Sequence, residues 1–228
     1  MQTYDPMPTP LRIAVLASGR GSNLAALLAA RERGELPVEF VLVASDKASA
    51  GALRLAEAAN IPTLALDPRG YPDRRAFDLD LFARIAASGA DLLVLAGFMR
   101  ILDGEALTPW IGRMINIHPS LLPKYRGLNT HRRALEAGDD EHGASVHFVT
   151  AELDGGPVIA QACLPIEAGD DEQQLAQRLL PLEHRLLPAV VGLLTSQRLQ
   201  WDGHAPRLDG QPLLAPLMLG DHGLLPAE

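Results

Sequence analysis

Short apolar runs alternate with segments of helical periodicity along the first half of the chain. Continuous apolar runs, typical of buried strands, lie at 12–17, 38–44, 61–66, 91–96 and 113–117. Between them, helices are predicted at 24–33, 48–59 and 74–88. This alternation predicts an α/β fold with a mostly parallel, Rossmann-like twisted sheet and helices on both faces. Ligands are then expected at the carboxyl ends of the strands.

The second half of the chain is less regular. A helix is predicted at 130–137, where Gly138 can end it, and strands follow at 144–150 and 157–165, either as a hairpin or merely adjoining. The helical pattern of 171–194 contains Pro181 and Pro188, so we expect a kink or a division there. From His204 onward no periodicity is visible, which predicts a loosely packed tail without regular elements at 204–228.

Composition narrows the class of protein. With 228 residues, 47% hydrophobic and 21% charged, the chain can bury the core of one globular α/β domain. A net charge of −8 without a Lys/Arg cluster argues against a dedicated nucleic-acid binder. The single Cys163 is expected to be a buried strand thiol. Because neither a secretory signal nor a membrane-spanning run is recognisable, we expect a cytoplasmic protein without a membrane partner.

A glycine-rich turn, Ser18-Gly19-Arg20-Gly21-Ser22-Asn23-Leu24, joins the first predicted strand to the first helix. Backbone amides at the helix start offer an anion site, and Ser22 or Asn23 can cap the helix, so an ordinary capped turn is the alternative. A dinucleotide site is disfavoured because Leu24 stands where a third small residue is expected, although Asp46 follows the second strand at a plausible distance.

Two polar side chains share one side of the fifth predicted strand. Asn116 and His118 alternate with Ile115 and Ile117, so they project to the same face at the strand's carboxyl end. An amide donor beside an imidazole can stabilise the oxyanion of an acyl-transfer intermediate and handle a proton. The alternative is a polar pair at the end of the strand whose hydrogen bonds are satisfied within the fold and which has no catalytic role.

Asp154-Gly155-Gly156-Pro157 forms a turn whose carboxylate could orient an imidazole. A turn aspartate usually has only a local role, and sequence separation does not establish that Asp154 meets His118. A metal site is not expected, because His131, His142, His147 and His184 lack the close spacing to other ligands that zinc sites show.

These segments together resemble the phosphoribosylglycinamide formyltransferase family. The resemblance rests on Gly21-Ser22-Asn23, the run from Leu95 to Leu102, Asn116-Ile117-His118-Pro119-Ser120-Leu121-Leu122-Pro123 and Asp154-Gly155-Gly156-Pro157, in matching order and spacing. It covers residues 11–203 as one catalytic domain, and leaves 1–10 as an N-terminal extension and 204–228 as the tail.

The resemblance implies transfer of a formyl group from 10-formyltetrahydrofolate to the amine of 5′-phosphoribosyl glycinamide, without a metal. Gly21, Ser22 and Asn23 would hold the substrate phosphate, and Glu183 would contact its ribose. The residues implied for the folate site are Arg74, Met99, Arg100, Ile101, Leu102, Asn116, Thr150, Ala151, Glu152, Leu153 and Asp154. Asn116 and His118 would bind the oxyanion, while Asp154 keeps His118 protonated and helps a water to carry the proton.

Three alternatives remain. Methionyl-tRNA formyltransferase and formyltetrahydrofolate hydrolase share such a catalytic core. The first is expected to carry a tRNA-binding domain with a basic surface, and the second an N-terminal regulatory domain. Neither feature is expected of this acidic sequence, so both alternatives are disfavoured. The third is a nucleotide-binding module without turnover, against which the set Asn116, His118 and Asp154 argues. The expected partners are small molecules, not nucleic acid, and both a monomer and a homodimer remain open.

Overall fold

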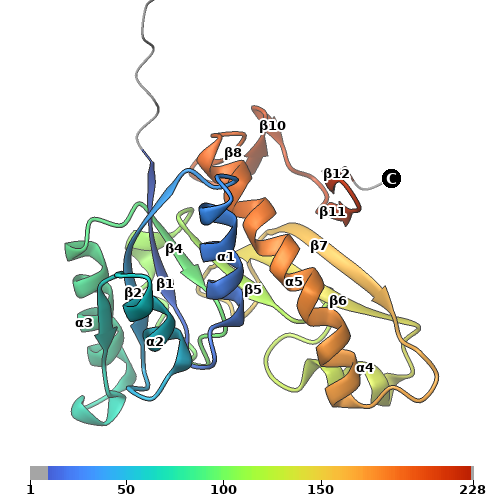
Figure 1. Ribbon diagram of the computed structural model, residues 1–228, viewed down its shortest axis with the longest axis horizontal. Helices are drawn as coiled ribbons and strands as arrows, with labels where there is room; N and C mark the ends of the chain where they lie inside the picture. Colours follow the sequence, from blue (N-terminus) through green and yellow to red (C-terminus); the bar gives the residue numbers. More distant parts are fainter. Residues whose placement is uncertain (1–9, 227–228) are drawn as a thin grey trace, which may run out of the picture.

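Nine strands of the computed structural model, which describes residues 10–226, form one mixed sheet (Figure 1). Their order is β12-β11-β7-β6-β5-β4-β1-β2-β3. The strands are β1 (Leu11–Leu16), β2 (Val38–Ser45), β3 (Thr63–Ala65), β4 (Leu92–Leu95), β5 (Met114–His118), β6 (Glu141–Phe148), β7 (Val158–Pro165), β11 (Leu217–Gly220) and β12 (Gly223–Leu225). The predicted extension at 1–10 lies outside the described residues except for Pro10.

The strands β3, β2, β1, β4 and β5 are all parallel, as the alternating pattern predicts. The carboxyl ends of β1, β4 and β5 therefore meet at one edge of the sheet. β6 runs antiparallel to both β5 and β7, so the two strands predicted in this region form a hairpin. The mostly parallel α/β fold is confirmed.

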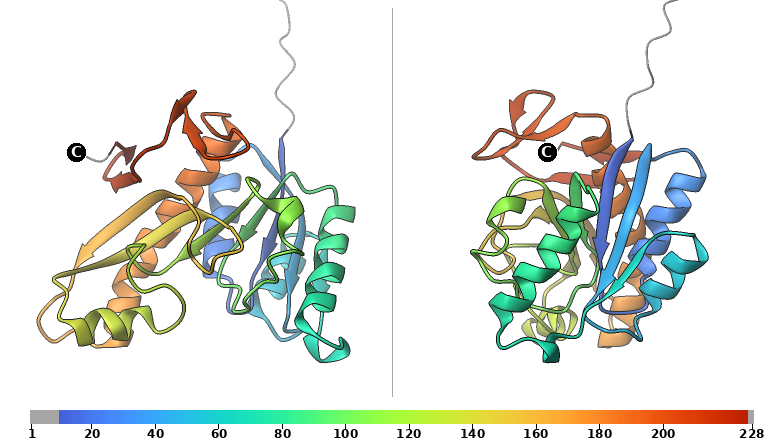
Figure 2. Two further views of the ribbon diagram at one scale, coloured as in Figure 1. Left: turned by 180° about the vertical axis from the view of Figure 1, so that it is seen from behind. Right: turned by 90° about the vertical axis from the view of Figure 1, so that its left-hand side faces the viewer.

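Helices cover both faces of the sheet. They are α1 (Ser22–Glu32), α2 (Gly51–Ala58), α3 (Arg74–Ala87), α4 (Thr130–Ala137) and α5 (Glu172–Thr195), with short 3₁₀ turns at Pro68–Gly70 and Thr108–Trp110. Alternate residues of β1 enter different cores: Ile13 packs with α1, α2 and α5, whereas Ala14 packs with α3. The right-hand view of Figure 2 shows α3 on one side of β1 and β2, and α1 on the other.

The helix α5 is continuous through Pro181 and Pro188, so the expected division there does not occur. Each proline removes one backbone hydrogen bond. Leu175, Leu179 and Val190 are completely buried along the length of α5, and this packing against the sheet holds both halves in one helix.

The predicted absence of regular structure after His204 is wrong. A three-stranded sheet forms from β8 (Leu199–Trp201), β9 (Pro206–Leu208) and β10 (Gln211–Pro212), and β11 then pairs in parallel with β7. Figure 1 shows these strands gathered along the upper edge of the molecule. Leu217 is 5% exposed, so tertiary pairing with the edge of β7 orders a segment that has little local propensity.

Candidate active site

The glycine-rich turn between β1 and α1 packs tightly against α2. Gly21 has φ +86°, and a Cβ atom on it would lie 2.8 Å from the Cα atom of Ala52, so both conformation and space require glycine. Gly21 is the N-cap of α1, and no side chain caps the helix, contrary to the role considered for Ser22 and Asn23. The first backbone N–H groups of α1 have no acceptor within the helix, so they are available to bind an anion.

Asn23 and Glu183, predicted to bind one substrate, lie together. Asn23 Nδ2 donates to Glu183 Oε2 at 2.8 Å, which joins the start of α1 to α5. The Oδ1 atom of Asn23 is buried without a hydrogen-bond partner within residues 10–226. Burial raises the pKa of Glu183, and the hydrogen bond from Asn23 opposes that shift. The two residues predicted to bind one substrate are therefore hydrogen-bonded to each other across α1 and α5.

Ser18 links three loops at this edge, which sequence reasoning missed. Its hydroxyl donates to Asp46 Oδ1 at 2.6 Å and accepts the Met99 amide at 3.0 Å. Asp46, weighed above for a dinucleotide site, instead accepts the hydroxyl of Ser18, which joins the loop after β2 to the loops after β1 and β4. No periodic pattern marks a bond of this kind, because its partners lie far apart in sequence.

The predicted folate residues Met99 to Leu102 occupy the loop after β4. Met99 is 64% exposed and Ile101 56% exposed, so this loop presents apolar side chains to solvent. The Arg100 guanidinium instead lies 4.6 Å from the ring centroid of Phe77, which places it against α3. Arg74 is exposed at the start of α3.

The carboxyl end of β5 carries Asn116 and His118 on the same face, as predicted, while Ile115 and Ile117 enter the core. The structure also brings His147 of β6 opposite Asn116, with Asn116 Nδ2 3.1 Å from His147 Nε2. Sequence reasoning did not assign His147 to the site. The signal that could have found it is the hairpin register, because His147 alternates with Ser145 on the strand that pairs with β5.

His147 orients the Asn116 amide. The His147 Nδ1 atom lies 2.8 Å from the carbonyl of Phe148, which can only accept, so Nδ1 carries a proton. In the neutral ring Nε2 is then an acceptor, and Asn116 donates to it. This bond leaves the second amide proton of Asn116 available.

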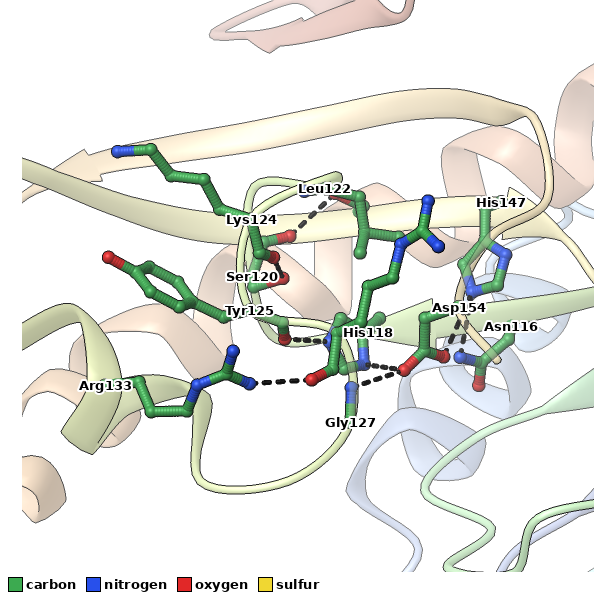
Figure 3. Close-up of polar contacts among 12 residues, drawn as sticks. Asn116, His118, Ser120, Leu122, Lys124, Tyr125, Gly127, Arg133, His147 and Asp154 are labelled. Carbon is green, nitrogen blue, oxygen red and sulfur yellow. Dashed lines mark hydrogen bonds and ion pairs between the residues drawn. The ribbon is translucent and has the colours of Figure 1, made fainter. Parts of the chain in front are cut away.

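Asp154 lies between the two imidazoles (Figure 3). Its Oδ2 atom is 3.5 Å from His118 Nδ1 and accepts the Gly127 amide at 2.8 Å, while its Oδ1 atom is 3.7 Å from His147 Nε2. The pairing that the sequence left open is therefore present. Asp154 has φ +46°, and a Cβ atom on Gly156 would lie 1.9 Å from the Phe148 carbonyl oxygen, so the turn is set by close backbone approach.

Burial lowers the pKa of His118 below its ordinary value, although the Tyr125 carbonyl and the Asp154 carboxylate both raise it. The expectation that Asp154 keeps His118 protonated is thus wrong in net direction, because desolvation of the ring outweighs the ion pair. For Asp154 burial opposes ionisation, but the neighbouring His147, the Gly127 amide and His118 together hold its pKa below the ordinary value.

The predicted residues Thr150 to Leu153 form the loop before Asp154. Ala151, Glu152 and Leu153 are exposed, and Glu152 forms an ion pair with Arg126. This loop and the exposed Met99 loop belong to the connections that follow β6 and β4.

Across residues 10–226 no group of three or more His, Cys, Asp or Glu side chains is arranged to hold a metal ion. Cys163 lies half-buried in β7, where burial and the nearby Glu141 raise its pKa to about 11. No described helix combines the length and apolar composition needed to cross a membrane.

The chain was compared with known proteins. Residues 11–191 match the formyl transferase family. The phosphoribosylglycinamide formyltransferase of Escherichia coli is 47% identical, over 89% of this chain and 96% of that protein. The human trifunctional purine biosynthetic protein adenosine-3 is 40% identical over 83% of this chain, which corresponds to 19% of that larger protein.

Solved structures agree. That of the phosphoribosylglycinamide formyltransferase of Coxiella burnetii aligns with a TM-score of 0.85 and 46% identity, covering 90% of this chain and 96% of that chain. The resemblance inferred from the four motifs is thereby confirmed. The chain belongs to the formyl transferase family, and its relatives there include phosphoribosylglycinamide formyltransferases.

Proposed function

We propose that this protein transfers the formyl group of 10-formyltetrahydrofolate to the amine of 5′-phosphoribosyl glycinamide, a step of purine biosynthesis. The observation that carries the proposal is the meeting of Asn116, His118 and Asp154 at the carboxyl end of β5. Family membership supports a folate-derived formyl donor.

The phosphorylated substrate is proposed to bind at the start of α1. Gly21, Ser22 and Asn23 offer amides and a positive helix end to the phosphate, as electrostatics favours there. Glu183 already accepts a hydrogen bond from Asn23, and its remaining oxygen can accept from ribose hydroxyls. The glycinamide amine would then extend toward β5.

The folate is proposed to occupy the other side of the site. Met99 to Leu102 supply apolar surface from the loop after β4, and Thr150 to Asp154 supply the opposite loop. Arg74 offers a cation for the glutamate tail of the folate. Asn116, between these loops, would reach the formyl oxygen.

In the reaction the amine nitrogen attacks the formyl carbon, and the carbonyl oxygen becomes an oxyanion. The free amide proton of Asn116 and the imidazole of His118 would stabilise that charge. A nearby negative charge raises an imidazole pKa, so the oxyanion would oppose the effect of burial and favour protonated His118, with Asp154 paired to the imidazolium. The amine loses a proton through water, N10 of the folate gains one, and the C–N10 bond breaks.

The test is a product assay with both substrates. Formylated glycinamide ribonucleotide is expected in equal amount to tetrahydrofolate. Release of formate without amine formylation would indicate a formyltetrahydrofolate hydrolase, and formylation of methionyl-tRNA would indicate that alternative activity. Nucleotide binding without turnover would support a binding module and contradict the proposal.

Partners and location follow from the same proposal. Small molecules would be the ligands of this acidic chain, neither nucleic acid nor membrane being required, and a biosynthetic step of this kind would take place in the cytoplasm. A monomer and a homodimer are both compatible with a site built within one chain.

A further inference from the structure

The short segment 125–127 contacts the catalytic pair through two main-chain groups, one at His118 and the other at Asp154. The Tyr125 carbonyl lies 3.0 Å from His118 Nε2, and the Gly127 amide donates to Asp154 Oδ2 at 2.8 Å (Figure 3). Because a carbonyl can only accept, His118 Nε2 carries the proton of its bond. The placement of both side chains therefore depends on the backbone of residues 125–127.

That backbone does not hold its conformation unaided. Tyr125 has φ +55°, in the left-handed region that a residue with a Cβ atom rarely adopts, and Gly127 has φ +80°. A conformation of this kind persists only where surrounding contacts determine it. The contacts that determine it are found on the side away from the catalytic pair.

Asp139, just beyond the end of α4, supplies these contacts. Its Oδ2 atom accepts the Tyr125 hydroxyl at 2.7 Å, and Lys124 Nζ lies 3.0 Å from both carboxylate oxygens. The Asp139 side chain is 17% exposed, less than the 59% of Lys124, so the carboxylate is the sheltered member of the pair. Gly138, with φ +67°, turns the chain so that Asp139 faces the segment.

Arg133 of α4 completes the support. Its Nη1 atom donates to the Arg126 carbonyl at 2.7 Å, and its guanidinium lies 5.1 Å from the Tyr125 ring centroid. On the preceding side, the Ser120 hydroxyl donates to the Lys124 carbonyl at 2.7 Å. The Tyr125 side chain is thus held at its hydroxyl by Asp139 and at its ring face by Arg133.

We propose that Asp139 is a positioning residue for the catalytic pair. Through the Tyr125 hydroxyl and Lys124, it holds the backbone that places the Tyr125 carbonyl against His118 and the Gly127 amide against Asp154. The inference rests on the proposed formyl transfer for its kinetic consequence, but the placement of His118 can be measured without any substrate.

The kinetic test compares Asp139→Ala and Tyr125→Phe with Asp140→Asn. Asp140 is the matched control, since it is an exposed neighbouring carboxylate whose side chain makes no hydrogen bond or ion pair within the described chain. For Asp139→Ala we expect kcat to fall on the order of tenfold, with the KM for each substrate changed by about twofold or less. Tyr125→Phe, which removes only the hydroxyl, should lower kcat in the same direction, and Asp140→Asn should match the parent.

The spectroscopic test follows the ring N–H resonance of His118 at one pH by NMR. Asp139→Ala and Tyr125→Phe should shift this resonance, which reports the bond to the Tyr125 carbonyl, while Asp140→Asn leaves it in place. Circular dichroism would establish that each variant is folded, and Tyr125→Phe keeps the test open if Asp139→Ala is not. An unchanged resonance and unchanged kcat in folded variants would overturn the proposal. Should the parent form no formylated glycinamide ribonucleotide, the proposed function fails, and the resonance still decides the role of Asp139.

Discussion

The Nδ1 atom of His118 lies 3.5 Å from the Oδ2 atom of Asp154, and the opposite nitrogen of the ring bonds to the Tyr125 carbonyl. Both neighbours are acceptors, so both favour the imidazolium, while burial of the ring favours the neutral form. The pKa of His118 therefore results from opposing effects, and a change of charge near the ring is expected to alter its protonation.

Asp154→Asn removes the charge and keeps the shape of the side chain. The pKa of His118 should fall further below its ordinary value, and kcat should fall on the order of a hundredfold with little change in either KM. NMR titration of the His118 ring in parent and variant measures the first effect directly. An identical His118 pKa in the two proteins would rule out Asp154 as its partner.

Asn116→Ala should lower kcat by a factor on the order of a hundred to a thousand, since it removes an oxyanion donor. His147→Ala should lower kcat less, because it only releases the Asn116 amide from its 3.1 Å contact. The two effects should not add, since His147 is proposed to act through Asn116. Steady-state kinetics of both single variants and the double variant provide the measurement, and full additivity would contradict the linkage.

Replacement of Ser22 and Asn23 by leucine should raise the KM for the phosphorylated glycinamide far more than the KM for the folate. Bulky apolar side chains would obstruct the amides at the start of α1 and break the bond from Asn23 to Glu183. Initial-rate measurements with each substrate varied in turn test this. Equal increases in the two KM values would count against a phosphate site at the turn.

Truncation at Asp202 should leave kcat unchanged in the folded protein but lower its Tm. Every proposed site residue precedes this point, whereas β11 covers the edge of β7 and Arg185 Nη2 donates to the Gly220 carbonyl at 2.7 Å. Leu217→Ala in the full chain should lower the free energy of unfolding by about 2–3 kcal/mol. Thermal unfolding of both variants measures these losses, and an unaltered Tm would mean that the tail strands contribute nothing to stability.

The free energy of unfolding should fall as the pH is lowered from about 6.5. The pKa of His142 is lowered from 6.5 to about 4, mainly because burial desolvates the ring and secondly because His131 lies beside it. The unfolded state binds the proton first, so stability present above pH 6.5 is lost between 6.5 and 4, up to about 3 kcal/mol. Urea unfolding at several pH values should show a shallower dependence for His142→Gln. His118, His131 and His184 shift in the same direction, so part of the dependence should remain.

The order of strands and helices could be predicted from the sequence because it follows from local patterns. Continuous apolar runs mark buried parallel strands such as β1 and β4, and helical spacing such as that of Phe77 and Leu81 marks α3. The placement of Asn116 and His118 on one face of β5 follows from strand alternation alone. Family membership also follows from the sequence, through motifs that lie within these elements or directly after them.

Tertiary structure alone decided the contacts between distant segments. The meeting of Asp154 with His118 and the addition of His147 depend on hairpin register, and the support from Asp139 depends on how α4 packs beside the loop after β5. The continuity of α5 and the strand β11 arise from burial against the sheet, which outweighs weak local propensity. The direction of the His118 pKa shift was likewise undetermined by the sequence, because desolvation depends on everything that surrounds the ring, and that environment exists only in the folded chain.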